Sequence, residues 1–382
     1  QQRFILVILR GGLDGLAAIP AWGDPHYRDA RGPLALPEPD KNNGVLDLNG
    51  FFGLHPSLPN LHDLYQSGEL VAIHGSAPPY HNRSHFDAQN VLETGIFPAH
   101  TATDGWLYRA LGNLAKANDV EHVALSVGPS VPAVLRGEHP VDSWAPGNLP
   151  DPDDDTLARV MELYSHDPVL GPKLASAMDT EGMAGNMGRN ATRGDALPVL
   201  AKAATRFLTN DSGPMIAVLE AGGWDTHANQ GADAGQLSNR LGQLDRVLGS
   251  LKVDMGSLWP NTTVLVVTEF GRTVAINGTR GTDHGVGGAA FMFGGAVVGK
   301  RVVADWQGLS KNKLFEGRDV APGIDHRQLF KSVLIDHLGA DPAYIDDVVF
   351  PGSSAQKPIA GLFRTQSSDE GDSHNLQTPS PG

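Results

Sequence analysis

Acidic and histidine side chains follow several short apolar runs of this sequence. The runs and the polar residues after them are Phe4 to Leu9 with Asp14, Met215 to Leu219 with Asp225 and His227, and Thr263 to Thr268 with Glu269. Such β-branched runs are typical of buried parallel strands, and the ligand crevice of an open α/β sheet lies beyond the carboxyl ends of its strands. We therefore expect these side chains to gather at one edge of a sheet.

Asp283 and His284 add another acid and imidazole in a glycine-rich loop. Carboxylates gathered without lysine or arginine between them repel one another, so burying them together is unfavourable unless a cation compensates. Mixed carboxylate and imidazole ligands suit Zn²⁺, Mn²⁺ or Fe²⁺ better than Ca²⁺. We therefore predict a divalent metal cofactor, zinc first, with manganese, calcium or magnesium as alternatives. The candidate ligands are Asp14, Asp225, His227, Glu269, Asp283 and His284. Taken singly, each acid could instead cap a helix or lie hydrated in a loop.

A second polar cluster, Tyr80 to Asp87, places Ser84 and His85 at a predicted helix start. A serine there commonly caps the helix. Its hydroxyl would also lie beside backbone N–H groups that bind an oxyanion, which makes Ser84 a candidate nucleophile. His81 and His85 could be metal ligands, acid or base groups, or plain residues of the helix start. Arg272 is a candidate for bidentate contacts with an oxyanion, although a solvated or ion-paired role is equally open.

The composition excludes several classes of function. A formal charge of −14 and a pI near 5.4 oppose binding to nucleic acid, which requires clustered Lys and Arg. No apolar stretch approaches the roughly 20 residues that span a bilayer. Cysteine is absent, which excludes disulfides and thiolate ligands. The chain enters a predicted strand soon after Gln1, so we expect any export signal to have been cleaved or omitted.

Strand and helix patterns alternate along the chain. The predicted strands are Phe4 to Leu9, Leu70 to His74, His122 to Val127, Met215 to Leu219, Thr263 to Thr268 and Ala289 to Phe293. The predicted helices are Asp155 to Tyr164, Leu197 to Leu208, Gly235 to Leu251 and His326 to Leu338. This alternation predicts an α/β fold, a three-layer α/β/α sandwich with a mostly parallel central sheet.

We expect residues 1–365 to form a single domain with two loop insertions, near residues 129–155 and 179–195, because both segments are rich in turn-forming residues. The segment Val297 to Val303 is expected to form a hairpin beside the parallel strands. Residues 366–382 contain hardly any apolar side chains, and we expect them to be disordered.

Several of these segments resemble an uncharacterised bacterial family of sulfatase-like proteins within the alkaline phosphatase superfamily. They are Phe4 to Gly15, His81 to Gln89, Gly222 to His227, and Thr268 to Thr273 with Asn277-Gly278 and Asp283 to Gly285. The resemblance covers most of residues 3–365. It implies an alkaline-phosphatase-like fold and, because members are typically exported through the twin-arginine pathway, a periplasmic or extracellular location.

The resemblance also implies roles for individual residues. One metal position of the superfamily would map onto Asp14, Ser84 and Glu269, and the other onto Asp225, His227 and His284. Two departures stand out. The superfamily has Asp-His where this chain has Glu269-Phe270, and the spacing from Asp225 to His227 is tighter than usual. The formylglycine maturation of sulfatases is not expected, because Ser84 is followed by His85-Phe86-Asp87-Ala88 rather than by x-Pro-x-Arg.

These observations lead to one main functional hypothesis and two alternatives. The main hypothesis is a metal-dependent hydrolase in which Ser84 attacks the phosphorus or sulfur of an anionic ester, with Arg272 or Arg83 contacting the oxyanion. Its partner would be a small-molecule ester or a polysaccharide. The first alternative is a non-catalytic metal-binding envelope protein on the same fold. The second is a phosphomutase or phosphotransferase, which differs in the acceptor.

Overall fold

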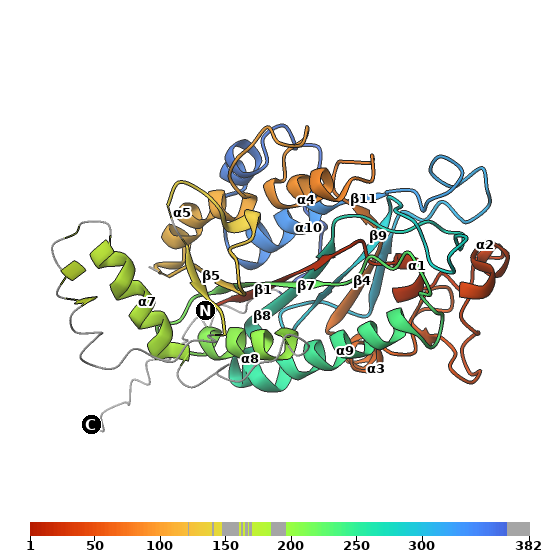
Figure 1. Ribbon diagram of the computed structural model, residues 1–382, viewed down its shortest axis with the longest axis horizontal. Coiled ribbons are helices and arrows are strands. Elements are labelled where there is room, and N and C mark those ends of the chain that lie inside the picture. The colour runs from red at the N-terminus through yellow and green to blue at the C-terminus, as the bar shows by residue number, and fades with distance from the viewer. Residues whose placement is uncertain are drawn as a thin grey trace, which may run out of the picture.

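The computed structural model describes residues 1–120, 122–139, 141–146, 160–161, 163–164, 167, 170–184 and 196–364. In this part of the chain nine strands form one central sheet, in the order β10-β4-β9-β8-β1-β7-β5-β6, with β11 also paired to β4 (Figure 1). The strands are β1 (Arg3–Arg10), β4 (Leu70–Ala77), β5 (Ala124–Val127), β6 (Asp142–Trp144), β7 (Ile216–Gly222), β8 (Thr262–Thr268), β9 (Gly288–Phe293), β10 (Arg301–Ala304) and β11 (Ile324–Asp325). A separate two-stranded sheet pairs β2 (Leu46–Asp47) with β3 (Gly53–Leu54).

The three apolar runs that precede the candidate site lie side by side in the centre of the sheet. β1 pairs in parallel with β7 on one side and with β8 on the other. The register aligns Arg10 with Gly222 and Leu9 with Thr268, so all three strands end at the same edge. The loops that carry Asp14, Asp225 and Glu269 therefore leave the sheet together, as the sequence predicted.

The sheet is mostly parallel, which confirms the predicted fold class. Among the described strands, β9 runs antiparallel to its neighbours β4 and β8. The predicted hairpin at Val297 to Val303 is wrong, because residues 301–304 form β10 and pair in parallel with β4. The connection from β9 instead crosses the end of β4, where the backbone N–H of Lys300 donates to the carbonyl of Leu70 at 2.8 Å.

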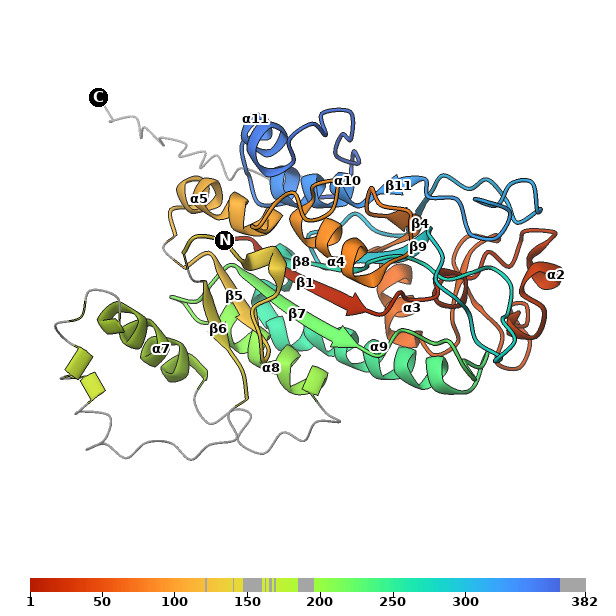
Figure 2. The same ribbon diagram turned by 45° about the horizontal axis from the view of Figure 1, so that its top comes forward.

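Helices cover both faces of the sheet and complete the sandwich (Figures 1 and 2). The α-helices are α1 (Gly15–Ala18), α2 (Tyr27–Arg31), α3 (Pro59–Gln66), α4 (His85–Thr94), α5 (Trp106–Asn118), α7 (Leu170–Ala184), α8 (Ala196–Leu208), α9 (Gln236–Met255), α10 (His326–Lys331) and α11 (Pro342–Tyr344). Shorter helical turns are Gly32–Leu34, Ala133–Leu135 and Gly256–Asn261, and two π-helical turns are Ser332–His337 and Ile345–Val349. The layer with α3, α8 and α9 packs on one face and the layer with α4, α5 and α10 on the other, each over its own apolar cluster.

The spacing of the leucines in α9 predicted which face of this helix is buried. In α9, the leucines at 237, 241, 244, 248 and 251 are all buried against the sheet, as their spacing predicted.

Residues 142–144, inside the segment expected to be an insertion, form β6 at the sheet edge. Most of the predicted helix Asp155 to Tyr164 and of the segment 179–195, and the tail 366–382, lie outside the described residues. Among the described residues, no helix is both long and apolar enough to cross a membrane.

Candidate metal centre

Imidazole and carboxylate groups from the start of α4, from the loop after β7 and from the loop before β9 converge beyond the carboxyl ends of β7 and β8. The ligand atoms of His85, Asp225 and His284 all lie within 4.8 Å of one another. His227 joins them, because its Nε2 lies 2.9 Å from Asp225 Oδ1 and 3.0 Å from His284 Nε2. The four side chains are between 25% and 44% exposed, so the cluster is open to solvent and to a ligand on one side.

Backbone hydrogen bonds between the loops hold this cluster together. The loop after β8 pairs with the loop before β9, since the N–H of Thr273 donates to the carbonyl of Asp283 and that of Gly285 to Gly271, both at 2.9 Å. The same loop reaches the segment after β7, where the N–H of Thr282 donates to Thr226 at 3.1 Å. Gly285 is required for this approach, because a Cβ there would lie 2.5 Å from the carbonyl of Arg272.

Each histidine of the cluster uses its Nδ1 atom to bind an oxygen outside the cluster. His85 Nδ1 lies 2.8 Å from Glu269 Oε1, His284 Nδ1 3.0 Å from the carbonyl of Arg83, and His227 Nδ1 3.3 Å from Asp283 Oδ1. Each of these oxygens can accept a hydrogen bond from Nδ1, and this leaves the Nε2 atom of each ring facing the cluster. Histidines that bind metals are oriented in this way.

Three Nε2 atoms face one another across the cluster. Those of His227 and His284 lie 3.0 Å apart, and they lie 2.9 Å and 3.3 Å from Asp225 Oδ1. His85 Nε2 is buried, lies 3.4 Å from Asp225 Oδ2 and has no hydrogen-bond partner in the part of the chain that the structure describes. Three imidazole nitrogens and one carboxylate form a donor set that fits Zn²⁺ or another transition metal better than Ca²⁺ or Mg²⁺.

Arg272 fixes the carboxylate of the cluster. Its side chain is fully buried and donates to Asp225 Oδ1 at 2.5 Å, to Thr282 Oγ1 and to the carbonyl of Thr282. Burial alone would raise the pKa of Asp225, but the hydrogen bond and charge of Arg272 outweigh it and lower that pKa. Asp225 is thereby kept anionic. The arginine that the sequence suggested for oxyanion contact lies beneath the cluster and positions Asp225.

Glu269 lies behind His85 and contacts the cluster through that ring. It is fully buried, and its Oε1 accepts from the backbone N–H of Gly11 at 2.8 Å and from Gln89 at 3.1 Å in addition to His85. Burial favours a raised pKa for Glu269, but hydrogen bonds from His85, Gln89 and Gly11 lower it overall. The hydrogen bond to Glu269 is also the main cause that raises the pKa of His85, against desolvation. Glu269 therefore orients the ring of His85, as Asp283 does that of His227.

The structure does not bring Asp14 into the cluster. Its Oδ1 accepts from the backbone N–H of Ala17 at 3.1 Å and caps α1, while its Oδ2 lies 2.7 Å from Arg31 and 2.7 Å from Gln230 Nε2. All of these polar side chains are buried. The cation that compensates this strand-end acid is a guanidinium from α2.

Ser84 occupies the N-cap position of α4, directly before His85. Its backbone is extended and its carbonyl accepts from the N–H of Ala88 at 2.9 Å, but its side chain makes no capping hydrogen bond. The sequence left open that the Ser84 hydroxyl only caps the helix, and the structure does not show this capping bond. The preceding residue, Arg83, has a left-handed backbone with a φ of 64°, and its side chain is ion-paired with Asp319 and Glu316 at 2.6 Å.

Phe270 follows Glu269 directly and lies against the histidines of the cluster. Its buried ring lies 4.8 Å from the ring of His85 and 4.9 Å from that of His284, measured between centroids. Phe270 thus forms an apolar wall beside two imidazoles of the cluster. One of them, His85 at the start of α4, is a residue that the sequence singled out without fixing its role.

The model of the family described as "Protein of unknown function (DUF1501)" matches residues 69–349. The chain belongs to this family. No curated protein matches it. Among solved structures, this DUF1501 protein is similar to a sulfatase from Pseudoalteromonas sp., with 11% identity, a TM-score of 0.45, and 96% of this chain and 74% of that chain covered. It is similar to a phosphonate monoester hydrolase of Agrobacterium radiobacter, with 14% identity, a TM-score of 0.42, and 90% of this chain and 74% of that chain covered. It is also similar to an alkaline phosphatase from the Antarctic bacterium TAB5, with 12% identity, a TM-score of 0.36, and 79% of this chain and 94% of that chain covered. Identities this low say nothing about activity.

Proposed function

We propose that this DUF1501 protein is a metal-dependent hydrolase of phosphate or sulfate esters that holds one divalent ion between His85, Asp225, His227 and His284. The observation that carries the proposal is the convergence of three Nε2 atoms on one carboxylate, each ring being held by an oxygen at Nδ1. Zinc is the ion we propose first, because mixed imidazole and carboxylate ligands suit it. When bound, such an ion would polarise the ester oxygen and lower the pKa of a hydroxyl or water.

The residues around the cluster have roles that fit this chemistry. Arg272 keeps Asp225 anionic, and Glu269 and Asp283 fix the rings of His85 and His227. Phe270 excludes water from one side. We propose Ser84 as the nucleophile, because its hydroxyl makes no capping bond and it stands at the N-terminus of the ten-residue helix α4, beside a ligand.

The proposed substrate is an anionic ester, either a small molecule or part of a polysaccharide. An extracytoplasmic location, which the resemblance to exported proteins implies, is part of the same proposal. A metal-binding protein without catalysis is the second candidate function. It is favoured by the engagement of Arg272, whose guanidinium is bonded to Asp225, Thr282 and Gly11 and cannot turn towards an oxyanion without breaking those bonds.

Metal analysis combined with an ester panel tests the proposal. Purified full-length chain, loaded with Zn²⁺ and dialysed, should retain one ion per chain by elemental analysis and should hydrolyse at least one 4-nitrophenyl phosphate, phosphonate or sulfate ester. His284→Ala should lose both properties, whereas His139→Ala, which removes an exposed histidine outside the cluster, should keep them. Retention of the ion without turnover on any ester would leave the non-catalytic candidate, and failure to retain an ion would exclude both.

A further inference from the structure

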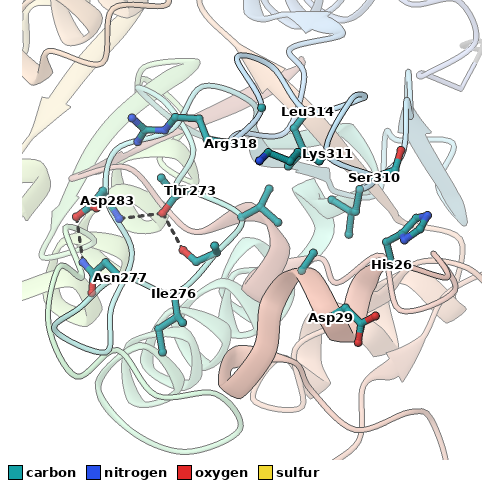
Figure 3. A pocket seen from close by; sticks show the side chains of 15 residues that line it. His26, Asp29, Thr273, Ile276, Asn277, Asp283, Ser310, Lys311, Leu314 and Arg318 are labelled. Carbon is teal, nitrogen blue, oxygen red and sulfur yellow. Dashed lines mark hydrogen bonds between the residues drawn. The ribbon is translucent and has the colours of Figure 1, made fainter.

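A pocket of about 580 Å³ opens beside the candidate metal centre (Figure 3). It shares residues with the support of that centre. Asp283, which holds His227 Nδ1, lines the pocket together with Asn277, whose side-chain amide donates to Asp283 at 3.0 Å. Arg318 lines it as well and donates to the carbonyl of His284 at 2.8 Å. One end of the pocket therefore lies a single side chain away from two of the proposed ligands.

The middle of the pocket is apolar. Val274 and Leu309 are buried beneath it, and Ile276 and Leu314 are partly exposed along its walls. Its volume is in the range that accommodates organic ligands, of roughly 300–1,000 Å³. An inorganic phosphate or sulfate would leave most of this space and its apolar lining unused.

The rim carries a cation on one side and the exposed carboxylate of Asp29 on the other (Figure 3). Lys311 is exposed, and no carboxylate lies within ion-pair distance of it among the described residues. The other cation of the rim, Arg318, is paired with Asp319 at 3.1 Å. Figure 3 shows Lys311 and Leu314 along the same side of the pocket, between Arg318 and Ser310. In a chain with a net charge of −14, an unpaired lysine beside an apolar surface is well placed to attract an anionic group.

We propose that this pocket binds the alcohol portion of the ester, and that this portion is an apolar ring system or chain carrying an anionic group that pairs with Lys311. The inference rests on the proposed function, because it assumes that the ester group itself lies at the metal centre. Asp283 and Arg318 line the pocket and also contact His227 and His284. The ester group at the metal centre and the alcohol portion in the pocket would therefore lie side by side. The substrate is thus an ester with two anionic ends separated by an apolar body.

Non-hydrolysable sulfonates test this inference by direct binding. Titration calorimetry on the full chain, with and without Zn²⁺, would compare methanesulfonate, naphthalene-2-sulfonate and naphthalene-2,6-disulfonate. The disulfonate should bind most tightly and methanesulfonate most weakly. Lys311→Gln should weaken the disulfonate about threefold to fivefold, as expected for an exposed ion pair, and should change naphthalene-2-sulfonate less. Lys313→Gln, an exposed lysine of the same loop that does not line the pocket, is the matched control and should change neither.

The apolar wall is tested separately. Ile276→Ser should weaken both naphthalene probes about fivefold or more, whereas Val253→Ser, which removes an exposed valine of α9, should have no effect. Equal affinities for the three probes, or no difference between Lys311→Gln and Lys313→Gln, would overturn the inference even in a chain that hydrolyses esters. A chain that shows the expected probe affinities but hydrolyses no ester would support the ligand chemistry of the pocket and overturn the proposed function instead.

Discussion

The guanidinium of Arg31 lies 2.7 Å from the carboxylate of Asp14, and both side chains are buried. This pair compensates the charge of Asp14, a strand-end acid that the sequence and the family resemblance assigned to a metal ion. The positive charge comes from α2, 17 residues further along the chain. Gln230 extends the pair towards the candidate centre, because it donates to Asp14 and accepts from Thr226 and Thr282.

Loss of this pair should be costly. Arg31→Met leaves the Asp14 carboxylate buried without its cation and should destabilise the protein by about 3–5 kcal/mol. Arg28→Met is the matched control on the same helix, because Arg28 forms an exposed pair with Glu38 and should contribute at most about 1 kcal/mol. Urea unfolding of the two variants measures the difference. Equal midpoints for Arg31→Met and Arg28→Met would contradict a buried structural role for Arg31.

The sequence located the edge of the candidate site well, because apolar strands and their register obey simple periodicities. Asp225 and His227 follow the end of β7, and Asp283 and His284 lie in the loop before β9. These four residues do lie together.

The sequence could not separate the side chains that form the cluster from those that hold its histidines in place. Glu269 follows β8 and Asp225 follows β7, the strands on either side of β1, in the same way, but only the folded chain places Glu269 behind His85. That distinction depends on where α4 begins in space. Gln230 was not predicted to belong to the site, because an uncharged amide carries no signal in one sequence. In the structure its side chain connects three loops.

Removing the support of His85 should weaken metal binding without removing a ligand. Glu269→Gln replaces the anion at His85 Nδ1 by a neutral amide, so the affinity for Zn²⁺ should fall about 10–100-fold. Asp283→Asn should have a smaller effect, because Asp283 is exposed and lies 3.3 Å from His227 Nδ1. Competition with a chelating dye measures both constants. A larger loss for Asp283→Asn than for Glu269→Gln would show that His85 is not held as proposed.

Three buried histidines should make the fold sensitive to acid. Burial lowers the pKa of His74, His326 and His337 to about 4. The unfolded chain takes up these protons near pH 6.5, whereas the folded chain excludes them until about pH 4, so stability is complete above pH 6.5 and declines as the pH falls through this window.

His326 offers the test of this prediction, since it lies far along the chain from the candidate centre, at the start of α10. A pKa lowered to about 4 corresponds to about 3 kcal/mol of stability lost at pH 4 for this one group. Urea unfolding at pH 7.5 and pH 5 should therefore show a smaller acid-induced loss for His326→Leu than for the unchanged chain. An identical loss in both proteins would mean that His326 takes up no proton on unfolding in this range.

Ser84 is the residue on which catalysis and simple metal binding differ most clearly. Ser84→Ala removes the proposed nucleophile while leaving His85, Asp225, His227 and His284 in place, so it should keep its Zn²⁺ and lose about a thousandfold or more in turnover. Ser57→Ala, which removes a hydroxyl bonded to Ser238 beside α9, is the control and should retain full activity. Acid quenching of the unchanged chain during turnover, followed by mass spectrometry, should reveal a phosphoryl or sulfuryl group on the peptide that contains Ser84. Undiminished turnover in metal-loaded Ser84→Ala would instead show that water attacks the ester directly, and the serine would then have no covalent part in the reaction.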